Sequence, residues 1–214
     1  MISRKLFVGL LHIGCFAFLL LGCNYNPKYK LPIIGQQTLE NGEVIDHVIR
    51  PFEFIDQDSN IITNATYRGK VYVTDFFFIS CPSICPLMTK QMLRLYTHYE
   101  QEPQLLFLSH TIDPRHDSPI RLKHYADKLG VTSSKWHFVT GNKDSIYNIA
   151  KDYFIAVQDD SKGTDPASLI HSGKFMLIDG TGHVRSFCDG TDPKSVEKFM
   201  FDIDQLLKEH KSEK

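Results

Sequence analysis

Residues 71–92, VYVTDFFFISCPSICPLMTKQM, decide the fold of this chain. Val71–Ile79 is almost continuously apolar and rich in aromatic and β-branched residues, a pattern that predicts a strand buried on both faces. The pattern then breaks, and Pro86 lacks the N–H group that a helix interior requires, so it fits only the first turn of a helix. We therefore predict a strand, a turn, and a helix that begins between Cys81 and Ser83.

Cys81 and Cys85 would then lie where the strand ends and the helix begins. The positive end of the helix dipole favours thiolate over thiol, so both cysteines should have a lower pKa than a free cysteine. Residues four apart share one face of a helix, roughly 5–6 Å apart at Cβ, so the two sulfurs can form a disulfide or converge on one ion. The alternative is a pair of buried apolar cysteines, and the flanking prolines argue against it because they place the pair on a turn.

The composition is that of an ordinary globular protein. The chain has 214 residues, of which 42% are hydrophobic and 23% are charged, with a formal net charge of −1. This length allows one domain or a small two-domain protein with a sizeable core. A nucleic-acid-binding protein would carry a basic face, so we expect no nucleic acid among the partners.

Residues 1–22 have the layout of a secretory signal, with Arg4 and Lys5 before the apolar run Leu6–Leu21. The run ends in LLGC, which resembles the bacterial lipobox, whose cysteine becomes the lipidated first residue; here that residue is Cys23. The alternative is an uncleaved membrane helix, for which the run is short. We expect a membrane-anchored lipoprotein, because two or more acyl chains hold a protein stably on a bilayer. Its domain would lie on the extracytoplasmic (periplasmic) side, in an oxidising compartment.

The cysteine count also favours a redox or metal site over a disulfide framework. Cys15 is lost with the signal and Cys23 is lipidated, which leaves Cys81, Cys85 and Cys188. Three cysteines cannot form a structural disulfide framework. One adjacent pair and one odd thiol is what a redox or metal site leaves, and we expect Cys188 to be half-buried.

The segment after the signal reads as a linker. Residues 23–47 have scattered proline and glycine and weak periodicity, so we predict a membrane tether there, in which Leu31–Ile34 could still dock on the domain. The domain itself is expected to cover residues 48–210.

After an N-terminal hairpin, the predicted elements follow the order β-α-β-α-β-α-β-β-α. We expect strands at residues 52–54, 61–62, 71–79, 104–109, 136–140, 154–157, 174–178 and 183–187, and later helices at 119–129, 144–153 and from 193 onward. This order predicts an α/β fold, in which a mainly parallel sheet ends in an antiparallel hairpin and helices cover both faces. Ligands of such sheets bind beyond the carboxyl ends of the strands, where the two cysteines would lie.

His171 is the third candidate site residue. It stands where a polar loop meets the strand predicted at 174–178. A lone histidine is more often a surface or capping residue, so position alone does not assign it a function.

Four stretches together resemble the Sco/SenC family of copper proteins. Phe78–Pro86, FISCPSICP, resembles the CPxxCP signature, and Ile112–Pro119, IDPRHDSP, resembles the DPxxDTP segment. Trp136–Gly141, WHFVTG, resembles the WxFLTG segment, and His171–Asp179, HSGKFMLID, resembles the histidine strand. The resemblance covers residues 48–208, and four motifs in order are more specific than any one.

The resemblance implies a thioredoxin-like (peroxiredoxin-like) fold with copper bound by Cys81, Cys85 and His171. Two thiolates and one imidazole are soft ligands that suit Cu(I), with Cu(II) as the other oxidation state to consider. Structural zinc would require four protein ligands. Copper binding and disulfide formation would compete for the same sulfurs, because only the thiolate is a ligand.

In function, the resemblance implies a membrane-anchored copper chaperone that assembles the CuA centre of cytochrome c oxidase. Its partner would be the CuA-bearing subunit or another copper protein. The alternative is a thiol-disulfide reductase that acts on the cysteines of a copper-receiving protein. A peroxidase of the peroxiredoxin type is a third hypothesis, but the threonine and arginine that it requires are not found around Cys81.

Asp75 favours the reductase hypothesis. It interrupts an apolar strand six residues before Cys81, where thioredoxins carry a buried aspartate and where the Sco pattern, as we align it, has an apolar residue. A buried carboxylate has a raised pKa and could relay the proton of Cys85 during disulfide exchange. The alternative is an edge-facing or capped acid.

The segment around Asp113 is expected to support the site. We expect Asp113 and Asp117 to shape and cap a turn above the cysteines, with a role as outer copper ligand as the alternative. His110 and His116 flank this segment and are expected to be solvated rather than ligating.

Overall fold

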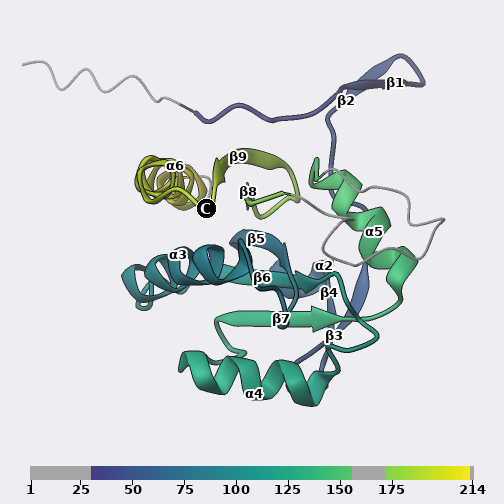
Figure 1. The fold of residues 1–214 in the computed structure, drawn as a ribbon. Helices are drawn as coiled ribbons and strands as arrows, with labels where there is room; N and C mark the ends of the chain where they lie inside the picture. Colours follow the sequence, from purple (N-terminus) through teal and green to yellow (C-terminus); the bar gives the residue numbers. More distant parts are fainter. Residues whose placement is uncertain (1–29, 156–171, 213–214) are drawn as a thin grey trace, which may run out of the picture.

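A seven-stranded sheet is the centre of the computed structural model, which describes residues 30–155 and 172–212 (Figure 1). Its strands lie in the order β4-β3-β7-β6-β5-β8-β9. The strands are β3 (Glu53–Asp56), β4 (Ile61–Thr63), β5 (Val71–Phe77), β6 (Leu105–Thr111), β7 (Trp136–Thr140), β8 (Lys174–Ile178) and β9 (Val184–Asp189). The helices are α2 (Asn64–Tyr67), α3 (Cys85–His98), α4 (Pro119–Leu129), α5 (Lys143–Asp152) and α6 (Pro193–Ser212).

The middle of the sheet is parallel and both flanks are antiparallel. β5 pairs in parallel with β6, and β6 with β7, whereas β8 is antiparallel to β5 and β9 to β8. On the other flank β3 is antiparallel to both β4 and β7. The α/β fold and its closing antiparallel hairpin are confirmed. The parallel part is narrower than we expected, because the hairpin before β5 joins the same sheet.

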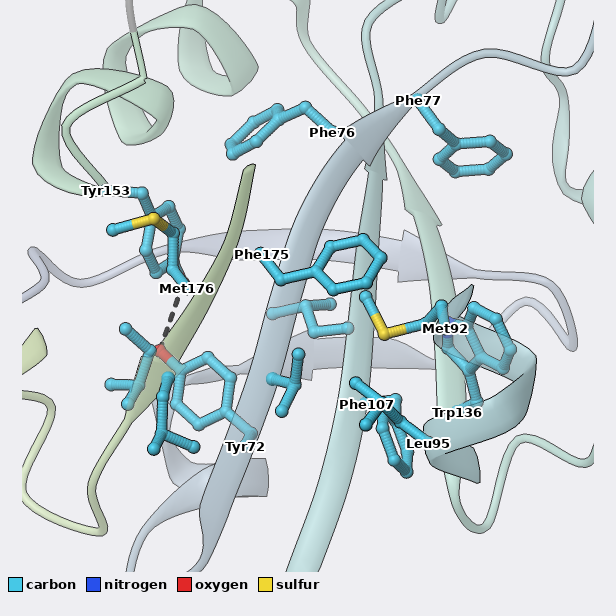
Figure 2. Close-up of a cluster of buried hydrophobic side chains, with 14 of the residues drawn as sticks. Tyr72, Phe76, Phe77, Met92, Leu95, Phe107, Trp136, Tyr153, Phe175 and Met176 are labelled. Atoms are coloured by element: carbon cyan, nitrogen blue, oxygen red, sulfur yellow. Dashed lines mark hydrogen bonds between the residues drawn. The ribbon is translucent and has the colours of Figure 1, made fainter. Parts of the chain in front are cut away.

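Helices cover both faces, as the sequence predicted. All seven residues of β5 are buried, and successive side chains point to opposite faces. On one face the ring of Tyr125 in α4 stacks on Phe77, with 5.6 Å between ring centroids. On the other, the hydroxyl of Tyr153, which ends α5, lies 3.0 Å from the hydroxyl of Tyr72. Figure 2 shows Phe77 and Tyr153 on opposite sides of β5.

Two helix boundaries show how well local signals work. α4 begins at Pro119 and ends before Gly130, which takes the left-handed conformation at φ 71°, as the sequence suggested. α3 begins at Cys85, so the predicted start between Cys81 and Ser83 is wrong. The residues before Cys85 form a turn instead, because the Cys81 N–H donates to the carbonyl of Phe78 at 3.2 Å.

The segment predicted as a tether contains structure. It forms a two-stranded hairpin of β1 (Thr38–Glu40) and β2 (Glu43–Ile45), whose residues are all exposed. Leu31–Ile34 docks on the domain, as the sequence allowed, because the Ile34 N–H donates to the carbonyl of Val184 at 2.8 Å.

The strand predicted at residues 154–157 is not confirmed, and the predicted signal segment lies outside the described residues. Phe154 is not in a strand but in a turn with φ 56°, and residues 156–157 lie outside the described part. The signal at residues 1–22, with Cys15, and the proposed lipidation site Cys23 also lie outside it. Over residues 30–155 and 172–212, no helix is long and apolar enough to cross a membrane.

Candidate functional site

Cys81 and Cys85 flank the turn that follows β5, at the carboxyl edge of the parallel strands. Cys81 lies in the turn and Cys85 is the first residue of α3. Both are buried, and within the described part of the chain Cys81, Cys85 and Cys188 are all free thiols. Two reduced sulfurs four residues apart are therefore available either to an ion or to each other.

The environments of the two sulfurs differ. Burial alone would raise the pKa of Cys81, but hydrogen bonds from the backbone of Ser83 and Cys85 and from the Cys85 thiol outweigh it, so the pKa of Cys81 is lowered. Burial raises the pKa of Cys85 far above its usual value, and the charges of Cys81 and Asp75 raise it further. The predicted lowering is thus wrong for Cys85, because its sulfur is buried more deeply than the helix dipole can offset.

Asp75 lies within the sheet, so the edge-facing alternative is wrong. Asp75 in β5 is the pairing partner of Ser109 in β6, and its Oδ1 accepts a hydrogen bond of 2.5 Å from Ser109 Oγ. The indole N–H of Trp136 donates to the same hydroxyl at 2.9 Å. Burial raises the pKa of Asp75 to about 7, although the bond from Ser109 lowers it somewhat. At neutral pH this carboxyl can therefore take up or release a proton.

Asp117 supports the turn that carries Cys81. Its Oδ2 accepts hydrogen bonds from the N–H of Ile79 at 3.1 Å and from Thr111 Oγ1 at 2.6 Å. The side chain is fully buried, and burial raises its pKa. Its role in shaping the turn is thus visible in the structure, whereas the helix cap is Ser118, which makes no side-chain capping bond.

The two histidines near this segment differ in environment. His116 is exposed, and its Nδ1 lies 2.8 Å from Oδ2 of Asp113. His110 is fully buried, so the prediction that it is solvated is wrong. Its ring stacks on Phe76 at 4.8 Å, and burial lowers its pKa to about 3. Neither ring nitrogen has a partner among the described residues, which leaves His110 a neutral core residue.

His171 lies outside the described residues, and within those residues no three His, Cys, Asp or Glu side chains form a metal site. Its chain neighbour Ser172 is described. Ser172 borders a cavity of about 450 Å³ that is also lined by Ile84, which precedes Cys85, and by Cys188. The start of the histidine strand therefore borders the same cavity as the dithiol turn.

Cys188 is more buried than we predicted. It is only 5% exposed, and burial raises its pKa to about 12. A protonated, buried thiol is a poor nucleophile and a poor metal ligand.

Ser109 and Thr111 donate to the two aspartates and Trp136 donates to Ser109, and none of these three roles was predicted from the sequence. Ser109 and Thr111 are two of the three polar residues at the end of the apolar strand β6. Polar residues at the carboxyl end of a buried strand were the signal that could have pointed to them.

The donor set also suits a soft ion. Cys81 and Cys85 supply two sulfurs, and thiolate is the ligand that Cu(I) prefers. A family model described as SCO1/SenC matches residues 41–208. The chain belongs to the SCO1/SenC family.

Solved structures agree with this assignment. A SCO1/SenC family lipoprotein from Bacillus anthracis is 30% identical with a TM-score of 0.66, over 75% of this chain and 95% of that one. BsSco, a Sco protein of cytochrome c oxidase assembly described with a disulfide switch, is 28% identical with a TM-score of 0.64, over 75% and 93%. Yeast Sco1 with copper bound is 27% identical with a TM-score of 0.54, over 73% and 88%. The predicted thioredoxin-like Sco fold is confirmed.

Proposed function

We propose that this SCO1/SenC protein is a membrane-anchored copper chaperone that binds its cargo through Cys81, Cys85 and His171. The observation that carries the proposal is the pair of free sulfurs at the carboxyl edge, in a turn whose Ile84 lines the same cavity as Ser172 at the start of the histidine strand. The copper-bound structure of yeast Sco1 supports copper as the ion. The CuA-bearing subunit of cytochrome c oxidase is the proposed recipient, since BsSco is a cytochrome c oxidase assembly protein.

The protein groups would handle copper as cargo. The pKa of Cys81 is lowered and that of Cys85 is raised, so Cys81 gives up its proton to a metal ion more readily than Cys85 does. Two sulfurs and one imidazole suit Cu(I) and leave a coordination position open for transfer to a recipient. Oxidation to a Cys81–Cys85 disulfide would remove both sulfur ligands.

The difference in pKa between the two cysteines favours a second candidate function, a thiol-disulfide reductase. The Cys81 thiolate would attack a partner's disulfide and form a mixed disulfide, and one partner sulfur would leave as a thiolate. Cys85 would pass its proton to the Asp75 carboxylate, attack Cys81 and release the second partner sulfur. Two electrons would thus move from the dithiol to the partner's cysteines. The disulfide switch described for BsSco supports redox chemistry at this pair.

An anaerobic titration of the full chain with Cu(I) tests the chaperone proposal. We expect one copper per reduced chain, and loss of tight binding in Cys81→Ser, Cys85→Ser and His171→Ala. Cys188→Ser is the matched control, because it removes a cysteine that borders the same cavity. Tight binding that survives in all three ligand variants would contradict the proposal.

The same variants separate the two functions. His171→Ala should leave disulfide reduction unchanged, because the imidazole takes no part in that reaction, while either serine variant abolishes it. A reductase activity that depends on His171 would contradict this division.

Cys23 is the proposed anchor, and the lipoprotein from Bacillus anthracis supports it. The domain would then lie on the extracytoplasmic side. We expect Cys23→Ala to release the protein from membranes. Continued attachment would instead indicate an uncleaved membrane helix.

A further inference from the structure

The N-terminal segment is fastened to the domain by one arginine. Arg185 donates through Nη2 to the carbonyl of Leu31 and to Oε2 of Glu209, and through Nε to the carbonyl of Pro32 at 3.2 Å. Its Nη1 lies 3.0 Å from Oδ2 of Asp179. The other oxygen of Glu209, Oε1, accepts from the N–H of Leu31 at 2.8 Å. We call Leu31–Ile34 with Arg185, Asp179 and Glu209 the latch.

The latch is built as a buried contact. Leu31 is 5% exposed, and the side chains of Arg185 and Glu209 are 12% and 7% exposed. Charge-assisted hydrogen bonds in such a setting are stronger than neutral ones and require defined geometry. The bond from Ile34 to Val184 adds a backbone pairing next to this cluster. The segment is therefore held at two neighbouring points.

The latch lies at the end of the sheet opposite the cysteines. Val184 pairs with Ile178, and Ile178 pairs with Tyr72 near the start of β5. Lys211, at the end of α6, contacts Glu102 just before β6, which places the last turn of α6 at the same end. Cys81 follows the other end of β5, whose seven residues span roughly 20 Å.

The position of the latch shortens the connection to the proposed anchor. From Cys23 to Leu31 there are eight residue steps, which reach at most about 29 Å when fully extended. Without the latch, the next attachment among the described residues is His47, whose Nε2 lies 2.8 Å from the carbonyl oxygen of Asp152. The connection would then have 24 steps and reach at most about 86 Å. The latch thus reduces the maximum reach about threefold.

We infer that the latch holds the end of the domain opposite the cysteines toward the lipid bilayer, so that the dithiol faces away from the membrane. This inference rests on the proposed membrane anchor, and it holds for a lipidated Cys23 and for an uncleaved helix, because both end near the same residue. The partner would accordingly present its cysteines in the aqueous layer above the bilayer, not at the lipid surface.

Helix α4 offers a matched pair of reporter positions. Ile120 at its start and Lys128 at its end are both exposed, and eight residue steps separate them by about 12 Å. Variants Ile120→Cys and Lys128→Cys, in a Cys81→Ser, Cys85→Ser, Cys188→Ser background of the full anchored chain, would each have one free cysteine in the domain to carry a donor dye. Energy transfer to an acceptor lipid in vesicles then reports which end of α4 is nearer the bilayer.

We expect the dye at position 128 to lie nearer the bilayer than the dye at position 120, by up to about 12 Å. The difference should vanish in Arg185→Ala, which opens the latch, and persist in Lys123→Ala, which removes an exposed cation of α4. Because Arg185→Ala could also unfold the domain, a second variant inserts ten Gly/Ser residues after Asn26. This insertion lengthens the connection, leaves the latch intact and should also abolish the difference.

Equal distances at both positions in a membrane-bound, folded protein would overturn the inference, as would rapid hydrogen exchange at the amides of Leu31 and Ile34. Chain that is not recovered with the vesicles would instead overturn the proposed anchor, so the two failures are distinguishable.

Discussion

Two aspartates at opposite ends of the sheet show how one type of side chain can serve two purposes. Asp75, near the cysteines, accepts a hydrogen bond from a hydroxyl, no cation of the described residues contributes to its pKa, and burial raises that pKa to about 7. Asp179, in the latch, is partly buried, but hydrogen bonds from Thr181, His183 and Arg185 lower its pKa. At the latch end, where Asp179 is paired with a cation, the ion pairs hold the N-terminal segment in place. At the cysteine end, the carboxyl of Asp75 has no such pairing among the described residues and is suited to proton transfer.

Removing the Arg185 side chain should reduce the free energy of unfolding more than any other change proposed for the two ends of the sheet. Arg185→Ala leaves the buried carboxylate of Glu209 and the partly buried carboxylate of Asp179 without their cation, and we expect the free energy of unfolding to fall by about 3–5 kcal/mol. Urea denaturation of the reduced protein measures it. Lys123→Ala is the control, since its side chain is 40% exposed and surface pairs contribute about 0–1 kcal/mol. A loss below about 1 kcal/mol in Arg185→Ala would show that the latch does not stabilise the domain.

Asp75→Asn should change the pH dependence of stability. The raised pKa means that the folded protein keeps a proton that the unfolded chain releases, so stability falls as pH rises from about 4 to about 7. The total is up to about 4 kcal/mol, at 1.36 kcal/mol for each pKa unit. Asp75→Asn cannot ionise and should remove this decline, as urea denaturation at pH 4.5 and pH 8 would show. Parallel curves for the two proteins would contradict the raised pKa.

For Asp179 we expect a pH dependence of stability with the opposite sign. Its lowered pKa contributes stability at neutral pH that is lost as the pH falls below the usual range of an aspartate. The two ends of the sheet should therefore lose stability in different directions of pH. Acid unfolding of Arg185→Ala, compared with that of wild type, separates the two contributions.

Asp117→Ala should have an intermediate effect. It leaves the N–H of Ile79 and the hydroxyl of Thr111 without their acceptor, which costs about 1–3 kcal/mol. The loosened turn should also raise the thiol pKa of Cys81, which depends on backbone hydrogen bonds in that turn. The pH dependence of alkylation at Cys81 measures this change. If it is the same in Asp117→Ala as in wild type, Asp117 stabilises the fold but does not influence the pKa of Cys81.

Cys188→Ala should have the smallest effect. We expect a loss of about 1 kcal/mol from the small cavity that it leaves, with copper binding unchanged. Weaker copper binding in this variant would mean that the third thiol participates in the site.

Local signals in the sequence predicted most of the central sheet. β7 was placed at Trp136–Thr140 and β8 at Lys174–Ile178, because short apolar runs bounded by turn residues leave little ambiguity. The apolar run around Asp75 indicated that its carboxylate could be buried, and the structure confirms the burial, whereas its role as a proton relay stays a prediction. The β1–β2 hairpin was missed, because its exposed residues carry no burial pattern.

Features that depend on distant partners could not be predicted. His110 looked solvated beside polar neighbours, yet its environment comes from rings such as Phe54 and Phe76, which belong to other strands. The latch joins Leu31 to Arg185 and Glu209 over more than 150 residues. The pKa of Cys85 likewise follows from tertiary burial, which local helix geometry does not reveal.

X-ray absorption of the reduced protein loaded with one Cu(I) would identify the atoms that bind the copper. We predict two sulfur ligands and one imidazole nitrogen at copper, and loss of the nitrogen alone in His171→Ala. A copper environment that is identical in wild type and His171→Ala would contradict this prediction.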